Sequence, residues 1–400
     1  MPENSDVAEA GRSRLLVVAA LGTAQTLAWA SSYYVPAILA DPIAGSIGCP
    51  RSWVFAAFSV ALLIAAFAGP RVGRFIDRHG GRGVLALSNI VLGAGLTALA
   101  AANGAVALFG AWTILGLGMA LGLYDAGFAA LTALYGRGAR GPITGITLIA
   151  GFASTVSWPL STLLNEALGW RETLLVWAGI NIAVGLPLNL LLPVPARAAP
   201  QASLPSGPSI GWKPYKEMVL LAFVFAAAWF VTGSMAAHLP RLLERAGATP
   251  VQAIAAAALV GPAQVAARLV EFVILQRVHP LVSARIAALL HPIGAGVLAV
   301  VGAPAAVAFA VFYGAGNGLL TSARGTVPLA VFGPRGYGER VGLLGAPARA
   351  AQAVAPLGFG LLLDVMGLSV ILVSAALCLA SFAALLFLRG RQPEPEQFEP

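Results

Sequence analysis

The sequence predicts an all-α polytopic membrane protein, with twelve transmembrane helices in two six-helix repeats. Three observations lead to this fold class: a mean hydropathy of +0.84, a charged fraction of only 10%, and a regular series of apolar runs long enough to cross a bilayer. A water-soluble domain needs about a quarter of its residues charged to cover its surface. Lipid must therefore cover most of this chain.

The apolar runs give the expected helices in chain order. A helix needs about 20 mainly apolar residues to cross the hydrocarbon core of a bilayer. Such runs occur at 15–38, 52–72, 83–102, 106–132, 142–165 and 173–194, and again at 217–239, 250–275, 282–302, 305–330, 341–363 and 368–388.

The segments around these runs define the expected domains. Residues 15–194 and 217–388 are expected to form two six-helix bundles, with a cytoplasmic N-terminal segment at 1–14, a cytoplasmic linker at 195–216 and a cytoplasmic tail at 389–400. The linker is rich in proline, serine and alanine, which is typical of flexible connections. No small-residue cleavage site closes the first apolar run, so the first helix is expected to be its own targeting signal.

The positive charges are placed asymmetrically, and this predicts the orientation. If both termini are cytoplasmic, most of the 24 Lys and Arg residues fall in inside segments, whereas only Arg51, Arg171, Arg241 and Arg245 fall outside. This is the positive-inside pattern. We expect a multi-pass protein of the cell inner (plasma) membrane, and we attribute the net charge of +8 to this asymmetry and not to a nucleic-acid partner.

The two halves can be aligned with each other. Residues 115–131 match residues 313–329, so that three glycines fall on three glycines: Gly116, Gly118 and Gly127 on Gly314, Gly316 and Gly325. With one residue of slip, Gly145 and Pro159 then fall on Gly342 and Pro356. A chance match in a glycine-rich chain is the alternative. Two parallel six-helix repeats are typical of transporters in which substrate binds between the halves.

The stretch GRFIDRHGGRGVL at 73–85 follows the second expected helix. Its pattern is G-x-x-x-D-R-x-G-x-R, formed by Gly73, Asp77, Arg78, Gly80 and Arg82. It resembles the cytoplasmic signature between helices two and three of the major facilitator superfamily, and this resemblance extends over nearly the whole chain. The resemblance implies a conformational latch, in which glycines let two helix ends approach closely, and Asp77 and the arginines hold the inside closed until the halves rock. A turn that only satisfies the positive-inside rule would explain the arginines but not Asp77.

A longer stretch, residues 116–171, resembles one branch of that superfamily, the oxalate/formate antiporters and monocarboxylate porters. The shared features are the glycine ladder, Tyr124, Tyr135, the basic turn through Arg140, Pro159 and the closing sequence Gly169-Trp170-Arg171. The resemblance implies a carrier of small organic anions.

Five ionisable residues lie inside expected helices: Asp125, Arg268, Glu271, Arg324 and Arg349. An ionised side chain at the centre of a bilayer costs at least about 3 kcal/mol, and it usually marks a substrate pathway or an ion pair. All five are expected to face the interior. Arg268 with Glu271, and Arg324 with Asp125, are either structural pairs or parts of a transport pathway, as coupling or cavity charges.

The branch resemblance implies roles for two of the arginines. Arg268 matches an arginine that contacts the substrate carboxylate, although Gln264 stands where the monocarboxylate porters have an aspartate. Arg349 stands where the oxalate branch has a lysine, and a guanidinium there is a bidentate anion clamp. Two cations facing one cavity favour a small anion with one or two acidic groups. Tyr33, Tyr34, Tyr124 and Trp158 are expected either to line this cavity or to serve as packing residues.

The remaining residues argue against other functions. No nucleophile elbow, P-loop or metal-binding pair of cysteines occurs, so we expect no enzyme activity, no cofactor and no metal. The expected partners are the lipid bilayer and a small-molecule substrate, with or without a coupled proton, and the chain is expected to be a monomer. The expected function is secondary transport of a mono- or dicarboxylate by exchange or proton coupling. Efflux of a drug or toxic metalloid on the same fold is the alternative.

Overall fold

The computed structural model describes residues 3–194 and 212–388, and within them every regular element is a helix. The helices of the first half are α1 (Glu3–Ala30), α2 (Val35–Ile47), α3 (Arg51–His79), α4 (Arg82–Ala100), α5 (Ala105–Gly122), α6 (Tyr124–Tyr135), α7 (Arg140–Ala150), α8 (Ala153–Leu168), α9 (Trp170–Ile180) and α10 (Leu186–Leu190). Those of the second half are α11 (Trp212–Arg245), α12 (Pro250–Ala258), α13 (Val260–Val273), α14 (Pro280–Val301), α15 (Ala306–Phe332), α16 (Tyr337–Met366) and α17 (Val370–Leu386).

These helices make twelve membrane crossings, as the sequence predicts. Ten stretches of the described residues are long and apolar enough to span a membrane. Two of them, Ala105–Leu168 and Tyr337–Leu386, have 64 and 50 residues and turn back on themselves at glycines with positive φ, Gly136 (φ 52°) and Gly367 (φ 58°). Each of these two stretches therefore crosses twice. The observed helices also continue past the predicted apolar runs, as α3 does to His79.

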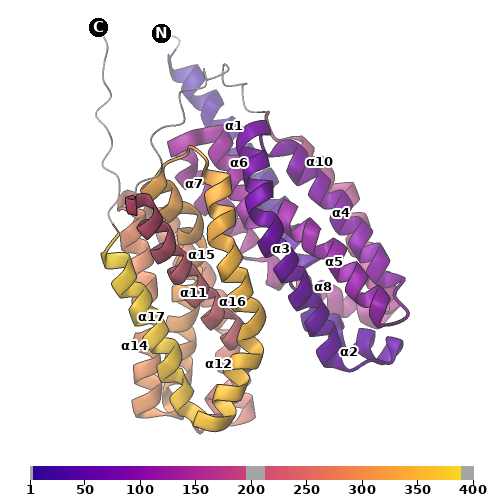
Figure 1. Ribbon diagram of the computed structural model, residues 1–400, viewed down its shortest axis with the longest axis vertical. Coiled ribbons are helices and arrows are strands. Elements are labelled where there is room, and N and C mark those ends of the chain that lie inside the picture. The colour runs from indigo at the N-terminus through magenta and orange to yellow at the C-terminus, as the bar shows by residue number, and fades with distance from the viewer. Residues whose placement is uncertain (1–2, 195–211, 389–400) are drawn as a thin grey trace.

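The crossings form two bundles that stand side by side (Figure 1). The first bundle packs around fully buried aromatic side chains that include Trp112, Trp177 and Phe128, and the second around Phe309 and Phe359. In Figure 1 the bundles lie close together at the end where α1 begins, and they diverge toward the end that holds α2 and α12.

Packing of the repeated glycines confirms that the halves are related. A Cβ atom on Gly116 would lie 2.6 Å from the Ala61 carbonyl oxygen in α3, and one on Gly314 would lie 2.6 Å from the Val260 carbonyl oxygen in α13. Since α3 and α13 are in the second crossing of their respective halves, the two glycines occupy equivalent packing positions. Gly118 and Gly316 likewise face the third crossing, α4 and α14.

Two expected domain boundaries shift in the structure. The segment expected at 1–14 is already helical from Glu3, and the last residues of the expected linker belong to α11, which begins at Trp212. Residues 195–211 of the linker and the tail at 389–400 lie outside the described residues.

Candidate functional site

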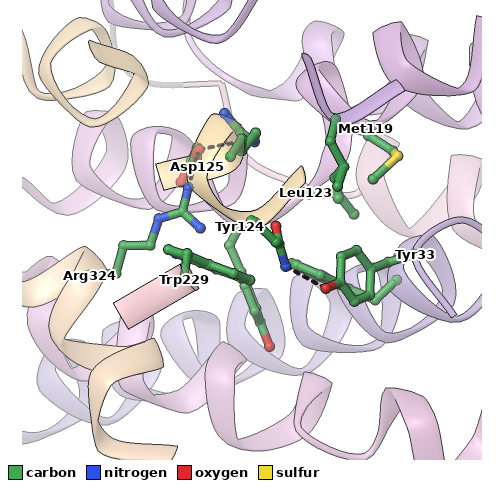
Figure 2. A pocket seen from close by; sticks show the side chains of 11 residues that line it. Tyr33, Met119, Leu123, Tyr124, Asp125, Trp229 and Arg324 are labelled. Carbon is green, nitrogen blue, oxygen red and sulfur yellow. Dashed lines mark hydrogen bonds and ion pairs between the residues drawn. The ribbon is translucent and has the colours of Figure 1, made fainter. Parts of the chain in front are cut away.

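A cavity lies between the two halves, lined by residues of both (Figure 2). The cavity is narrow, with about 10 Å³ of room for the centre of a water-sized sphere. The first half contributes Trp29, Tyr33, Leu62, Met119, Leu123, Tyr124 and Asp125, and the second half contributes Trp229, Arg324, Arg349 and Gln352. Both halves thus supply polar groups to one apolar cavity, the usual composition of a small-molecule site.

A break in the fourth crossing positions Asp125. Helix α5 ends at Gly122, Leu123 is extended (φ −83°, ψ −174°), and α6 begins at Tyr124. The side chain of Gln25 donates a hydrogen bond of 2.6 Å to the Gly122 carbonyl that the break leaves without a helical partner. Asp125 then lies in the first turn of α6, where the positive end of the helix dipole favours a carboxylate. Such discontinuous helices are typical of substrate and ion sites in transporters.

Asp125 binds two arginines of the other half through a single oxygen. Arg324 Nη2 lies 2.7 Å from Asp125 Oδ2, and Arg349 Nη2 bonds the same oxygen. All three side chains are at least nine-tenths buried. The Arg324 guanidinium also lies over the ring of Trp229, 5.0 Å from its centroid, in a cation–π contact. Figure 2 shows Asp125, Arg324 and Trp229 converging on the cavity.

Small residues make this cluster possible. A Cβ atom on Gly345 would lie 2.8 Å from Asp125 Oδ2 and 3.1 Å from both guanidinium groups, so a larger residue would have to displace the ion pairs. Arg349 Nη1 also donates to the Ala65 carbonyl oxygen at 3.4 Å. Asp125 Oδ1, in contrast, accepts no hydrogen bond from any described residue. The cluster is therefore held firmly on one side of the carboxylate, while the oxygen on the other side is buried without a donor among the described residues.

Aromatic side chains form the rest of the cavity wall. Trp29 packs against Tyr33 and Tyr124, with ring centroids 5.1 Å and 4.9 Å apart. The Tyr33 hydroxyl accepts a hydrogen bond from Gln352 Nε2, which joins the two halves again. Of the four aromatic residues expected from the sequence, Tyr33 and Tyr124 line this cavity. Tyr34 instead packs edge-on against Trp158 at 6.0 Å.

Arg268 and Glu271 lie in a different polar contact between the halves. Arg268 is 5% exposed and donates to the Thr147 carbonyl oxygen of α7 at 3.4 Å, to the Gly318 carbonyl oxygen at 3.4 Å and to Thr321 Oγ1 at 3.3 Å. Glu271 is 2% exposed, and its Oε2 has no hydrogen-bond partner among the described residues.

The structure therefore groups the intramembrane charges differently from the sequence analysis. Arg349 shares the cavity with Arg324, whereas neither Arg268 nor Glu271 lines it. Arg324 and Asp125 form an ion pair, as expected if they are structural partners. They also line the cavity, as expected of a transport pathway. No ion pair within 4 Å joins Arg268 to Glu271 in the described parts of the chain.

The expected latch lies where α3 meets α16. A Cβ atom on Gly73 would overlap the Gly338 carbonyl oxygen, and one on Gly342 would lie 2.6 Å from the Gly69 carbonyl oxygen. Two glycines spaced four apart on each helix thus let the two backbones touch, as small residues do in membrane helix pairs. The partner glycines, Gly338 and Gly342, lie outside the motif that the sequence analysis singled out.

Polar contacts reinforce the same interface. The Asp77 carboxylate accepts hydrogen bonds from the backbone N–H groups of Gly338 (2.8 Å) and Glu339 (2.9 Å), so it caps the first turn of α16 from the other half. Arg74, which the sequence analysis did not select, pairs with Glu339 at 2.6 Å.

The other expected latch residues lie beside this contact. Gly80 ends α3 with a φ of 82°. Arg78 and Arg82 make no hydrogen bond or ion pair to the second half within the described residues.

Comparison with known proteins shows the family. A model of the Major Facilitator Superfamily matches residues 18–306. The chain is similar to the crystal structure of the human organic anion transporter MFSD10 (TETRAN), with a TM-score of 0.71 and 16% identity over 93% of this chain and 99% of that chain. It is also similar to FucP, a transporter of the same superfamily in the outward conformation, with a TM-score of 0.72 and 15% identity over 95% of this chain and 100% of that chain. A search of the curated proteins finds no match.

At these low identities the two solved structures show the fold alone, while the family match covers well over half of the chain. The paired bundles and the helix interface at the predicted signature agree with it. The chain belongs to the major facilitator superfamily, whose members are membrane transporters.

Proposed function

We propose that this protein is a secondary transporter that moves a small organic anion by alternating access. The observation that carries the proposal is the meeting of Arg324 and Arg349 from one half with Asp125 from the other, in a cavity between the halves. Guanidinium groups bind carboxylates through paired N–H donors. A site shared by two halves that move against each other can be exposed to one side of the membrane at a time.

The direction of opening follows from the proposed orientation. We place both termini and the α3–α16 interface in the cytoplasm, in keeping with the positive-inside pattern. The interface of Gly73, Asp77 and Glu339 then closes the cytoplasmic side, and the divergent end faces the exterior. The conformation described here is on this view the outward one.

We assign energy coupling to the polar contact that contains Arg268 and Glu271. Exchange of anions needs no further group, whereas proton coupling needs a carboxyl that can take up a proton. Glu271 is the candidate, since it is buried next to Arg268 at a contact between the halves and one of its oxygens has no partner among the described residues. Arg268 would then couple this carboxyl to α7 through Thr147.

One observation favours the alternative substrate class. Four large aromatic side chains, Trp29, Tyr33, Tyr124 and Trp229, line the cavity, and such a wall suits a neutral or aromatic toxicant as well as an anion. Efflux of such a compound is therefore the second candidate function. The cavity arginines disfavour a lipophilic cation.

Counterflow in proteoliposomes tests the proposal. Labelled oxalate, formate, lactate and arsenite are each measured against a preload of the same compound, for the native protein and for Arg349→Gln, Arg268→Gln and Arg245→Gln. Arg245 is exposed at the end of α11 and serves as the matched control. Saturable exchange of a carboxylate that Arg349→Gln abolishes and Arg245→Gln retains is expected. Exchange of arsenite alone, or exchange indifferent to Arg349, would move the assignment to efflux.

A further inference from the structure

The charges in the central cavity do not cancel. Among the described residues that line it, the charged ones are Asp125, Arg324 and Arg349. Both guanidinium groups donate to the same oxygen of Asp125, so one carboxylate is shared by two cations. Arg268 and Glu271 lie outside the cavity lining and carry opposite charges. The cavity is thus left with one positive charge that no described side chain balances.

Hydrogen-bonding capacity is also left over on both sides of the cluster. A guanidinium has five N–H donors, of which Arg324 uses one on Asp125, while Arg349 uses one on Asp125 and one on the Ala65 carbonyl oxygen. Asp125 Oδ1 is a buried acceptor without a partner among the described residues. A buried carboxylate oxygen without a donor is costly, so a ligand that donates there gains free energy.

We propose that Asp125 sets the charge of the anion that the cavity accepts. The Asp125 carboxylate neutralises one of the two positive charges, so one positive charge remains for the substrate to balance. Asp125 Oδ1 remains to accept a hydrogen bond from a substrate donor. The complementary ligand is a singly charged carboxylate that carries a hydroxyl group. This assignment rests on the proposed function, which leaves the number of acidic groups open.

Charge balance excludes three other classes of ligand. A dianion would leave one negative charge unbalanced in a buried site and would bring its second carboxylate near Asp125, and like charges at such distances cost several kcal/mol. A zwitterionic amino acid satisfies Asp125 with its ammonium group but leaves the positive charge of the cavity unbalanced. A neutral alcohol leaves it unbalanced as well.

Acids of two carbons test this assignment at nearly constant size. Glycolate has one charge and a hydroxyl group, acetate has one charge and no hydroxyl group, and oxalate has two charges. Each acid is tested as an inhibitor of counterflow of the labelled carboxylate that the protein exchanges best. The native protein, Asp125→Asn and Asp364→Asn are compared. Asp364 makes an exposed ion pair with Arg241 at the periphery of the second half, so its variant removes the same charge far from the cavity.

The native protein is expected to rank glycolate above acetate and both above oxalate. Asp125→Asn leaves two unbalanced arginines, so the ratio of oxalate to glycolate affinity should rise by about tenfold or more, while Asp364→Asn leaves the ratio unchanged. A native preference for oxalate, or an active Asp125→Asn protein with the native ratio, would overturn the assignment.

The native ranking stands without any variant if Asp125→Asn fails to fold. If no carboxylate is exchanged or inhibits at all, the proposed function fails. Exchange with the wrong charge preference defeats only the role assigned to Asp125.

Discussion

Asp125 of α6 and Arg349 of α16 form a buried ion pair that joins the two halves of the protein beside the cavity. Because Arg324 shares the same carboxylate oxygen, the three residues differ in how much each one stabilises the fold. Removal of either arginine leaves a neutral pair, whereas removal of Asp125 leaves two buried cations without a counter-ion.

Asp125→Asn is therefore expected to destabilise the protein more than Arg324→Gln does. Loss of one partner of a buried ion pair costs about 3–5 kcal/mol when an uncompensated charge remains, and the arginine variant should cost clearly less. Thermal unfolding in detergent measures the order of the two midpoints. Equal midpoints would show that Asp125 does not hold both arginines.

Contact between glycine backbones at the α3–α16 interface should be sensitive to a single methyl group. Gly73→Ala is expected to separate the two helix ends, because its Cβ atom would overlap the Gly338 carbonyl oxygen. The matched control is Gly83→Ala in α4, where nothing lies within 4 Å of the added atom. Maleimide labelling of Val341→Cys, a position that is 1% exposed at this interface, reports the opening.

Labelling of Val341→Cys should rise in the Gly73→Ala background and stay low in the Gly83→Ala background. Similar labelling in both backgrounds would mean that the helix contact does not limit access from this end.

Asp77 should matter more at this interface than Arg74. The Asp77 carboxylate accepts two backbone N–H bonds at the start of α16, while the Arg74–Glu339 pair is exposed to solvent on both partners. Charged caps that bond helix N-termini contribute about 1 kcal/mol or more, whereas exposed ion pairs contribute about 0–1 kcal/mol. In the same labelling assay, Asp77→Asn should open the interface more than Arg74→Gln. The reverse order would contradict the capping role.

Gln25 is expected to support the helix break that positions Asp125. Gln25→Met keeps the size of the side chain but leaves the Gly122 carbonyl oxygen without its 2.6 Å hydrogen bond. An unsatisfied buried carbonyl group costs about 1–3 kcal/mol, so both the unfolding midpoint and the affinity for substrate should fall. Thr113→Val is the control, because among the described residues the Thr113 hydroxyl bonds only the Phe109 carbonyl oxygen one turn earlier in its own helix. A Gln25→Met protein with native affinity for substrate would contradict the role of Gln25 in positioning Asp125.

The fold could be predicted because lipid imposes a simple rule on the sequence. Every backbone polar group must be satisfied within the membrane, so long apolar runs have to be helices. The twelve crossings and the relation of Gly116 to Gly314 follow from this rule and from close helix packing. The helix break at Leu123 could not be predicted, because no proline marks it and its stability depends on Gln25, which lies 97 residues from Gly122 along the chain.

The candidate site could be predicted only in part. The five intramembrane charges are all buried, as the cost of a charge in lipid requires. Which of them share a cavity depends on how the two halves dock, and that arrangement brings Arg349 to Arg324 and not to Arg268. Trp229 and Gln352 are uncharged, so intramembrane charge does not indicate them in the sequence. The position of Trp229 in the middle of an apolar run could have indicated a cavity residue.

Alternating access requires the α3–α16 interface to open and close in each transport cycle, and a reversible cross-link can hold it shut. Arg74 and Glu339 lie in different halves, and their long side chains bridge the α3–α16 interface with a 2.6 Å contact. Cysteine side chains are much shorter, and a direct disulfide bond needs Cβ atoms about 3.5–4.5 Å apart. Arg74→Cys and Glu339→Cys are therefore joined by a short bis-methanethiosulfonate linker, which reduction releases. The matched control is Arg241→Cys with Asp364→Cys, which replaces an ion pair of the same length within the second half. The native Cys49 and Cys378 are replaced by alanine in both proteins.

Counterflow of the best carboxylate is then measured before cross-linking, after cross-linking and after reduction of the linker. Cross-linking is expected to abolish counterflow in the Arg74→Cys/Glu339→Cys protein and reduction to restore it, while the control protein exchanges substrate throughout. Full counterflow through the cross-linked α3–α16 interface would contradict alternating access.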